Sequence, residues 1–568
     1  MIKKIYFSIL FFFFVLTVTA QWTNNSLQNT LVRDSSGTSE VTPLSATTST
    51  GSTYISWFES FNGNYQLRMQ LLDAAGNKLW NQEGLIVSDY PQASSLSRYD
   101  LKVDHNDNAV VAFQDIRTGG NVNVVAYMID LSGNFVWGSA GISLIDPVSA
   151  SGQAPVIGVT ASNNIIIAWN AGGGSLQWVA SKKISAAGNL LWGSTTKRII
   201  DSTNAKKFTR PSIVPAGSDD FLMLYVQQTG SFPYTNTMFV QRYDINGDGA
   251  WPGSIQFSTK TTSFFFFPEA VSDLTDGMYM SFNTSNPLIL GLNDVYVQHV
   301  DGMGNLWSAS GSEAAVTTTN HSTTASLKFL FTRHEVWVLL KAQDSGQGMS
   351  GVTVQKFDTT GTALFAAAGV NVMPISNAYY EPYDFESTGN GMIIAFAENS
   401  GTTAKLLKAI KINYSGISAW GSGVVTVSSV VSPKLRLSEG TFHAGQVVVV
   451  WDDQRIDDGI YAQNIFDDGT IGPLAVPDLL AVNESFNLFP NPSDRLPVLK
   501  FITEQPGEIT LNISDALGKI IYSNNILLNS PSNEIDLTKL VDVRLHAGIY
   551  FIELAGRQGK EVKKLVIE

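Results

Sequence analysis

The stretch DLSGNFVWGSAG at residues 130–141 contains an aspartate, a glycine three residues later and a tryptophan four residues after the glycine. The stretches DAAGNKLW at 73–80 and SAAGNLLWGS at 185–194 repeat this order with small changes. Eight glycines hold the central position at steps of 53 to 59 residues: Gly76, Gly133, Gly188, Gly247, Gly304, Gly361, Gly416 and Gly469. Internal repeats of this length indicate a solenoid, a propeller or an array of small modules.

Three further columns of residues keep the same period. The aromatic residue after the glycine is Trp80, Trp137, Trp192, Trp251, Trp307, Phe365 or Trp420, and the eighth copy has none at this place. Short apolar runs end at Trp57, Phe113, Trp169, Tyr225, Phe282, Leu340, Phe396 and Trp451. In five copies a glutamine stands three residues before the first residue of the turn: Gln70, Gln241, Gln298, Gln355 and Gln463. Columns that share one period show that most of the chain is built from one repeated unit.

Each copy contains four short segments rich in β-branched and aromatic residues, such as IIIAW at 165–169 and DVYVQHVD at 294–301. Glycine, asparagine, aspartate and serine separate the segments, as expected for strands joined by turns. No stretch keeps a 3.6-residue apolar period, so no long helix is predicted. Four antiparallel strands repeated eight times predict an all-β fold in which residues 21–478 form an eight-bladed β-propeller.

The repeated turn has a clear chemical purpose. Its aspartate can accept hydrogen bonds from the backbone of the turn, and its glycine can adopt a positive φ without steric cost. We expect the tryptophan that follows to pack between neighbouring blades, because a buried aromatic side chain removes on the order of 150–250 Å² from water. Nine of the 12 tryptophans fall in the two aromatic columns. The alternative is that the turn tryptophans are exposed platforms for a sugar ligand.

The Asp, Gly and Trp of these copies resemble the tryptophan-docking motif of eight-bladed quinoprotein dehydrogenases, although the distance from Asp to Trp is one residue shorter here. The resemblance implies the propeller architecture and no redox function. The stretch WDDQRIDDGIYAQ at 451–463 is similar to repeats of secreted bacterial propellers.

The ends of the repeat region predict how the ring closes. The eighth copy lacks its tryptophan and runs into IGPLAVPDLL at 471–480 without a complete last strand. The segment SLQNTLVRDSS at 26–36 precedes the first complete copy. We therefore expect this segment to supply the outer strand of the last blade.

The C-terminal residues 484–568 leave the repeat and read as a small β-sandwich. ITLNISDALGKIIYS at 509–523 predicts a hairpin, and AGIYFIEL at 547–554 with KEVKKLVIE at 560–568 predicts a final pair of strands. The segment resembles the type A C-terminal sorting domain of the bacterial type IX secretion system. The residues that carry the resemblance are Pro490, Asn491 and Pro492 in NLFPNPS, Gly548 and Tyr550 in GIYF, and Lys564 in KKLV. It implies passage through the outer membrane of a bacterium of the Bacteroidota type, with the type IX machinery as partner.

The N-terminal residues 1–20 have the composition of a Sec signal peptide. Two lysines precede an apolar run from Ile5 to Val18, and the small residues before Gln21 predict cleavage after Ala20. The run is too short to span a bilayer, and no later stretch is more apolar, so we expect no transmembrane segment after processing. The mature protein is therefore predicted to be secreted or held at the cell surface.

Composition excludes several chemistries. The chain contains no cysteine, so disulfides, thiolate metal sites and cysteine nucleophiles are ruled out. The net charge of −13 argues against nucleic acid as a partner. The stretch from Asp244 to Gly249 begins like a calcium loop, but Ile255 stands where the last acidic ligand is required. We therefore predict neither a metal site nor a cofactor.

The loops that differ between copies are the candidate ligand-binding surface. In a propeller, the loops between successive blades share a face with the loops between the second and third strands, and varied loops on a rigid scaffold are typical of binding sites. The candidate ligand-binding residues on this face are Arg98, Tyr99, Phe208, Phe232, Tyr234, Tyr379 and Tyr380. The alternative is that these loops only cover the edges of the blades.

Two functions are compatible with the sequence. The first is a non-catalytic propeller that binds a glycan or a protein outside the cell. The second is a carbohydrate-active or quinone-dependent enzyme, for which carboxylates must project from the innermost strands into the central channel. Asp100, Glu269 and Asp384 lie near such positions, each in a different copy.

Overall fold

The computed structural model describes residues 22–568 except 93–96, 118, 147, 150, 174, 233, 264–265, 285–292, 318, 400–402, 474–485, 503–506, 517–518, 529–531, 542–544 and 557–558. The predicted signal peptide therefore lies outside the described residues. The chain divides into two compact units, Met1–Pro473 and Leu474–Glu568. Both are built almost entirely of β-strands, as the sequence predicts.

Six four-stranded antiparallel sheets follow one another along the first unit. The first contains β2 (Glu40–Thr47), β3 (Thr53–Phe61), β4 (Asn64–Leu72) and β5 (Leu85–Gln92), and the second β6 (Asp100–Val103), β7 (Ala109–Asp115), β8 (Asn123–Ile129) and β9 (Ile142–Ser143). The third contains β10 (Ser151–Val159), β11 (Ile165–Gly173), β12 (Leu176–Ile184) and β13 (Lys197–Ile199), and the fourth β14 (Lys207–Ala216), β15 (Asp220–Thr229), β16 (Thr235–Tyr243) and β17 (Ile255–Gln256). The fifth contains β18 (Ala270–Ser272), β19 (Met278–Asn283), β20 (Val295–Val300) and β21 (Ser312–Glu313), and the sixth β22 (Asn320–Leu330), β23 (Glu335–Asp344), β24 (Ser350–Asp358) and β25 (Val370–Ser376), with the short 3-10 helix η1 (Phe331–Arg333) between β22 and β23.

A seven-stranded sheet completes the unit, in the order β1-β31-β30-β29-β28-β27-β26. Its strands are β26 (Tyr380–Ser387), β27 (Gly391–Glu398), β28 (Ala404–Asn413), β29 (Val424–Glu439), β30 (Gln446–Asp453), β31 (Gly459–Phe466) and β1 (Thr30–Arg33). The long strand β29 pairs with β28 through its first part and with β30 through its second part. One strand thus serves as the last of one four-stranded group and the first of the next.

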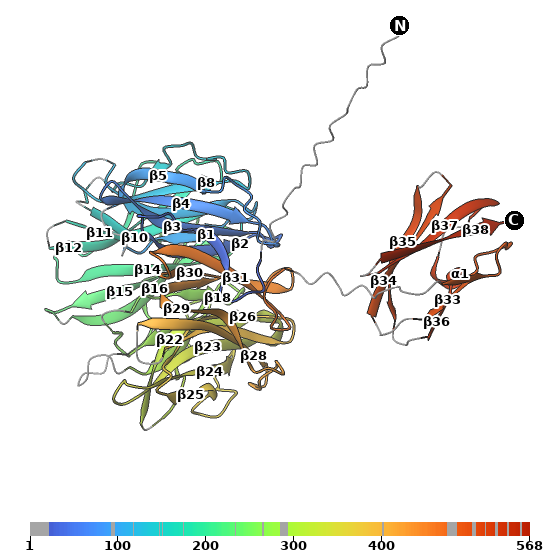
Figure 1. Cartoon of the computed structure of the whole chain (residues 1–568). Coiled ribbons are helices and arrows are strands. Elements are labelled where there is room, and N and C mark those ends of the chain that lie inside the picture. Colours follow the sequence, from blue (N-terminus) through green and yellow to red (C-terminus); the bar gives the residue numbers. More distant parts are fainter. Residues whose placement is uncertain are drawn as a thin grey trace, which may run out of the picture. The chain divides into compact units, whose positions relative to one another are not determined.

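The first strands of the successive groups form a closed cycle. The contacts run from β2 to β6, β10, β14, β18, β22, β26 and β29, and β29 contacts β2 again. Figure 1 shows this order as a progression of colour that brings the orange strands β30 and β31 beside the blue strand β1. The second and third strands of each group carry the apolar runs, and residues such as Trp57, Phe113 and Trp451 at the ends of these runs are buried.

The turn tryptophans pack between neighbouring sheets, which confirms that prediction. The ring of Trp192 lies over the turn glycine of the next sheet, Gly247, where a Cβ atom would come within 2.6 Å of it. Gly247 has φ of +73°, so both its conformation and its neighbour require glycine. The indole N–H of Trp192 donates to the carbonyl of Ile245, at 3.0 Å. The equivalent bonds join Trp80 to Leu131, Trp137 to Ala186, Trp251 to Gly302, Trp307 to Thr359 and Trp420 to Asp467.

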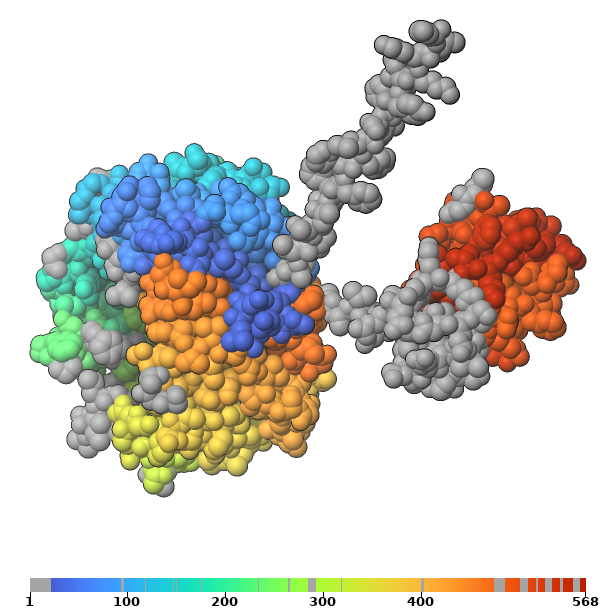
Figure 2. Space-filling view, viewed as in Figure 1, coloured from blue at the N-terminus to red at the C-terminus, as the bar shows by residue number. Residues whose placement is uncertain are grey.

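The N-terminal segment closes the cycle in the same way. Strand β1 pairs antiparallel with β31, which confirms the predicted role of residues 26–36 as the outer strand of the last group. Trp22, which the sequence analysis did not assign, lies over Gly76 and donates its indole N–H to the carbonyl of Ala74 at 2.9 Å. It therefore replaces the tryptophan missing from the eighth copy. Figure 2 shows the dark blue N-terminal residues lying against the orange residues of the last strands.

In five copies the glutamine column holds the turn aromatic or the residue after it in place. The side-chain amide of Gln70 donates to the carbonyl of Asn81, the residue that follows Trp80. In the closing sheet, Gln463 makes the equivalent bond to the carbonyl of Thr23, which follows Trp22. The remaining pairs are Gln241 with Trp251, Gln298 with Ser308 and Gln355 with Ala366.

The second unit consists of two antiparallel sheets and one short helix. One sheet has the order β32-β33-β36, and the other has the order β35-β34-β37-β38. Their bounds are β32 (Asn487–Phe489), β33 (Val498–Ile502), β34 (Gly507–Asp515), β35 (Ile520–Leu528), β36 (Ser532–Asp536), α1 (Leu537–Leu540), β37 (Gly548–Gly556) and β38 (Gly559–Ile567). Side chains from both sheets share one apolar core. The predicted hairpin and final strand pair are confirmed as β34 with β35 and β37 with β38, although the turn at Leu517 and Gly518 lies outside the described residues.

Candidate functional site

A cavity of about 650 Å³ lies where the first strands of the sheets face one another. Every strand of the closed cycle contributes to its wall, from β2 through β29. Six hydroxyl side chains belong to the polar part of the wall, and they come from Ser45, Ser212, Ser281, Thr324, Ser326 and Ser438. The charged side chains are Arg98, Asp100, Lys102, Glu269, Lys328, Asp384 and Glu439. Such a lining suits a polar ligand rich in hydrogen-bonding groups.

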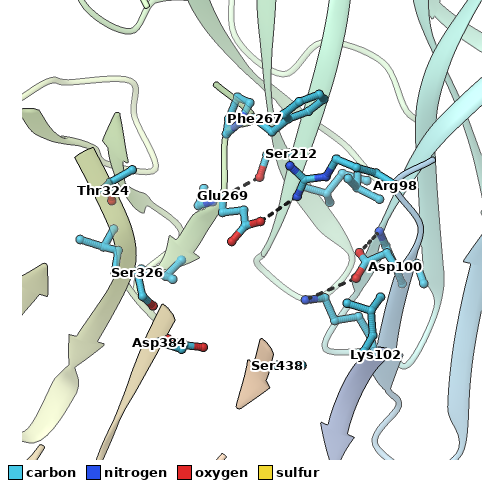
Figure 3. A pocket seen from close by; sticks show the side chains of 18 of the residues that line it. Arg98, Asp100, Lys102, Ser212, Phe267, Glu269, Thr324, Ser326, Asp384 and Ser438 are labelled. Atoms are coloured by element: carbon cyan, nitrogen blue, oxygen red, sulfur yellow. Dashed lines mark hydrogen bonds and ion pairs between the residues drawn. The ribbon is translucent and has the colours of Figure 1, made fainter. Parts of the chain in front are cut away.

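The three carboxylates expected to face a central channel all line this cavity, but they are held differently. Asp100 accepts the backbone N–H of Ile157 on the neighbouring strand at 2.8 Å, so it joins β6 to β10. Among the described residues, Asp384 accepts one local hydrogen bond, from the N–H of Phe385. Glu269 reaches out to Arg98, and their side chains are 2.8 Å apart. Figure 3 shows the Arg98–Glu269 pair on one side of the cavity and Asp384 on another.

Two serines of the wall join neighbouring sheets as Asp100 does. Ser212 on β14 accepts the N–H of Ala270 on β18, and Ser438 on β29 accepts the N–H of Ser45 on β2. These hydrogen bonds fix the spacing of the strands around the cavity. The cavity is therefore largely formed before any ligand enters.

Several acidic side chains lie close together where β22, β26 and β29 meet. Lys328 pairs with Glu386 at 2.8 Å, and burial raises the pKa of Glu386 although Lys328 acts in the opposite direction. Both carboxylate oxygens of Glu439 are buried and have no hydrogen-bond partner among the residues that the structure describes. Burial raises the pKa of Glu439 well above its usual range, and the nearby carboxylates of Asp384 and Glu386 raise it further. Both effects favour the protonated form of Glu439.

Sequence reasoning did not identify Lys328 or Glu439. Both lie inside strand patterns with no motif around them. Each of the strands β22, β26 and β29 changes register partway along, which decides the face on which later side chains emerge. The sequence carries no signal for the position of such a bulge.

Of the candidate ligand-binding residues, Arg98 and Tyr99 line the central cavity. Tyr99 is buried, and its hydroxyl donates to the carbonyl of Thr42 at 2.7 Å. Burial and this hydrogen bond within the fold therefore explain the position of Tyr99. Phe208 lies apart from this cavity, in the wall of a second cavity of about 330 Å³ between the third and fourth sheets.

The other four candidates pack against side chains of their own loop or of strands in the same or the adjacent sheet. Phe232 is exposed and contacts Tyr234 edge-on, and Lys207 lies 4.9 Å above the Tyr234 ring. Lys341 stands in the same relation to Tyr379, at 4.6 Å. Tyr380 packs edge-on against Phe396. None of these four residues lines the central cavity or the cavity beside Phe208. Phe264, Phe265 and residues 286–290, which also lie in these loops, are outside the described residues.

In the turn that begins like a calcium loop, the side chain of Asp244 binds backbone N–H groups of the turn itself. Asp244 accepts the N–H groups of Asn246 and Asp248. Across the described parts of the chain, no three histidine, aspartate or glutamate side chains converge in a way that could hold a metal ion. In the same residues, no helix is both long and apolar enough to cross a membrane.

The residues of the sorting motif meet in the second unit. The side chain of Asn491 donates to the carbonyl of Lys564 at 2.7 Å and accepts the N–H of Val566 at 2.9 Å. It thereby joins the start of the unit to its last strand. Tyr550 donates to the carbonyl of His546, just before Gly548. Pro490 and Pro492 flank Asn491, whose hydrogen bonds hold the entry segment beside β38.

Comparison with solved structures finds only distant likenesses. The type IX secretion component PorZ of Porphyromonas gingivalis is 10% identical, with 92% of this chain and 81% of that chain covered and a TM-score of 0.31. The α-L-arabinofuranosidase Arb93A of Fusarium graminearum is 11% identical, with 58% and 97% covered and a TM-score of 0.36. The Hadza microbial sialidase Hz136 is 9% identical, with 60% and 72% covered and a TM-score of 0.32. These scores are too low to support any inference about function.

A family match is found at the C-terminus. No curated protein matches the chain. Residues 487–568 match the secretion system C-terminal sorting domain family. This sorting tail indicates a type IX secretion cargo that is exported to the cell surface or secreted.

Proposed function

We propose that this protein is a surface-displayed or released β-propeller that binds a glycan in its central cavity. The observation that carries the proposal is the cavity of about 650 Å³, whose wall presents six hydroxyl side chains together with charged groups of both signs. Sugars are recognised by many hydrogen bonds from a largely pre-formed concave site. A protein partner requires roughly 800 Å² of surface on each side, which a cavity of this size does not offer.

We further propose eight blades for the propeller and a β-sandwich for the sorting unit. The six four-stranded sheets account for six blades, and the seven-stranded sheet accounts for two that share β29. The two C-terminal sheets with their common core support a sandwich. Cleavage of a signal peptide after Ala20 would leave Trp22 as the second residue of the mature chain, ready to close the ring.

The binding proposal is tested by filling the cavity. We expect Ser326→Phe to abolish binding to a glycan array that the unaltered mature protein binds, because the new ring would occupy the cavity. Ser202→Phe is the matched control, since Ser202 is exposed on the loop before β14 and lies outside the cavity. Binding that survives Ser326→Phe, or binding to proteins and to no glycan, would contradict the proposal.

A second candidate function is glycoside hydrolysis. Burial raises the pKa of Glu439, which lines the same cavity as Asp384, and a glycosidase uses a carboxyl group of raised pKa as its general acid opposite a second carboxylate. Release of reducing ends from a bound glycan, lost in Glu439→Gln while binding is kept, would support this function. Binding without any turnover favours the non-catalytic protein.

The export route is tested by truncation. We expect a chain lacking residues 484–568 to fold its first unit and to remain in the periplasm, because the sorting tail is what directs the protein onward. Fractionation followed by immunoblotting would show this. Appearance of the truncated chain at the surface or in the medium would exclude the tail as the sorting signal.

A further inference from the structure

The ion pair between Arg98 and Glu269 joins sheets that are not neighbours. Arg98 precedes β6 of the second sheet and Glu269 precedes β18 of the fifth, and β10 and β14 lie between them in the cycle. The other ion pairs among the described residues link groups within one sheet, between adjacent sheets or within the second unit. Arg98 and Glu269 therefore meet across part of the cavity mouth (Figure 3).

This pair contributes little to stability. The two side chains remain 43% and 79% exposed, and they share one contact of 2.8 Å. Exposed pairs of this kind stabilise a protein by about 0–1 kcal/mol. Glu269 can therefore be replaced at Arg98 by another carboxylate at little cost.

Arg98 is positioned independently of Glu269. Its guanidinium carbon lies 4.5 Å from the centre of the Phe267 ring. Phe267 is in turn contacted by Arg210, whose guanidinium lies 5.3 Å from the same ring and donates to the carbonyl of Phe266. A guanidinium stacked on an aromatic ring keeps its planar edge free to bind a carboxylate with two parallel hydrogen bonds.

We propose that Arg98 anchors a carboxylate of the ligand, and that Glu269 occupies this anchor in the free protein. The ligand class is then an acidic glycan built of uronic acids. Its carboxylate would displace Glu269 from Arg98, and its hydroxyl groups would meet the serine and threonine side chains of the wall. Glu269, once displaced, would be available to accept a hydrogen bond from a ligand hydroxyl. This inference rests on the proposed glycan binding.

The test compares oligogalacturonides with their methyl esters, and oligoglucuronides with theirs, by calorimetry on the mature full-length protein. Each pair differs only in its carboxylates. For at least one pair we expect the acid to bind at least tenfold more tightly than the ester. Arg98→Gln should remove this preference, so that acid and ester bind with similar affinity. Glu269→Gln should tighten acid binding several-fold, because the internal competitor is gone. Lys102→Gln is the matched control, since Lys102 lines the same cavity beside Asp100 and lacks the aromatic contact.

The outcomes separate the two proposals. Equal binding of acid and ester, or an acid preference that persists in Arg98→Gln, would overturn the carboxylate anchor and leave glycan binding intact. Binding of neutral glycans alone would do the same. Failure of every glycan to bind would overturn the proposed function itself. Melting curves of the variants would establish that they fold. The side chains of Arg98 and Glu269 are both exposed, so their replacement is expected to be tolerated.

Discussion

The six tryptophan contacts between consecutive sheets and the one made by Trp22 use the same geometry but are secured in different ways. In the consecutive sheets, each tryptophan follows the hairpin of its own sheet within a few residues, so the chain itself keeps it in place. Trp22 belongs to a sheet whose hairpin is at the other end of the repeat region. Nothing covalent nearby holds Trp22 against Gly76.

Burial and hydrogen bonding replace the missing covalent link. Trp22 is 0% exposed, whereas Trp80, Trp137 and Trp192 are only partly buried. The segment after Trp22 is fixed by Gln463, which binds the carbonyl of Thr23. Hydrogen bonds also join the rest of this segment to the last strands. They pair Asn29 with Val427, Gln28 with Arg455 and Asp34 with Tyr461. A contact that must overcome the entropy of joining distant chain ends needs more stabilisation than a local one.

The strongest test of this comparison is deletion of residues 21–36. We expect a large drop in melting temperature and loss of a compact state, because β31 loses its outer partner β1 and the first and last sheets lose Trp22. Thermal unfolding followed by circular dichroism, with size-exclusion chromatography, would measure both. Adding a peptide of residues 21–36 should restore part of the stability. An unchanged melting curve would show that the ring does not depend on its N-terminus.

The substitution Trp22→Ala separates the contribution of the tryptophan to stability from that of strand β1. Removal of a fully buried indole leaves a cavity, and we expect the free energy of unfolding to fall by about 3–5 kcal/mol. Trp22→Phe should cost much less, since Phe365 fills the equivalent position over Gly416. Chemical denaturation of the two variants gives the comparison. Equal losses for alanine and phenylalanine would mean that the indole N–H to Ala74, and not the ring, provides the stability.

The sequence predicted the repeating part of the fold because each column has a local cause. The turn glycines, the apolar runs and the aromatic residues repeat with the strands that need them, so their spacing reveals the sheets. Trp22 continues the tryptophan column, but no turn glycine stands before it in the sequence. The spacing of the glycines therefore does not predict its position.

The central cavity was predictable only in outline. Asp100, Glu269 and Asp384 were placed near the axis because they lie at the starts of the repeats. The pairing of Arg98 with Glu269 joins residues from non-adjacent sheets, and no local pattern encodes a contact of that kind. Phe232, Tyr234, Tyr379 and Tyr380 were predicted from the variable loops. They pack against each other or against Lys207, Lys341 and Phe396 of nearby strands, which accounts for their positions.

Trp192→Ala measures a contact within the consecutive sheets. Because Trp192 is partly exposed and is tethered by its own hairpin, we expect a loss of about 2 kcal/mol, roughly half that of Trp22→Ala. Trp137→Ala should behave alike, since it makes the same contact with Gly188. Urea unfolding would measure both. A loss equal to that of Trp22→Ala would remove the distinction, and a stable variant that no longer binds glycan would identify the tryptophans as ligand platforms.

Glu40 makes the closing region sensitive to pH. Burial raises its pKa from 4.5 to about 7, although hydrogen bonds from Thr38 and Ser35 act to lower it. The folded state therefore binds this proton more tightly than the unfolded state, so stability falls as the pH rises from about 4.5 to 7 and stays lower above pH 7. Compared with the unaltered protein, Glu40→Gln should gain on the order of 3 kcal/mol in free energy of unfolding at pH 8 relative to pH 4, since the pKa rises from 4.5 to about 7 and each pH unit corresponds to about 1.4 kcal/mol. Melting curves at the two pH values would check this, and a pH-independent difference would exclude Glu40 as the titrating group.

The smallest expected effect concerns Phe365. At this position a phenylalanine, and not a tryptophan, packs over the turn glycine of the next group of strands. In the matching positions, the carbonyl of Ile245 accepts from both Trp192 and Lys183, at 3.0 and 3.2 Å. The carbonyl of Tyr414, beside Phe365, already accepts from Lys356 at 2.9 Å and can take an indole N–H in the same way. We therefore expect Phe365→Trp to raise the free energy of unfolding by about 0.5–1.5 kcal/mol, the net value of one hydrogen bond. Guanidinium unfolding of the variant would measure the change. A decrease would show that this sheet is spaced for the smaller ring, and that shape alone, without the N–H, holds the consecutive sheets together.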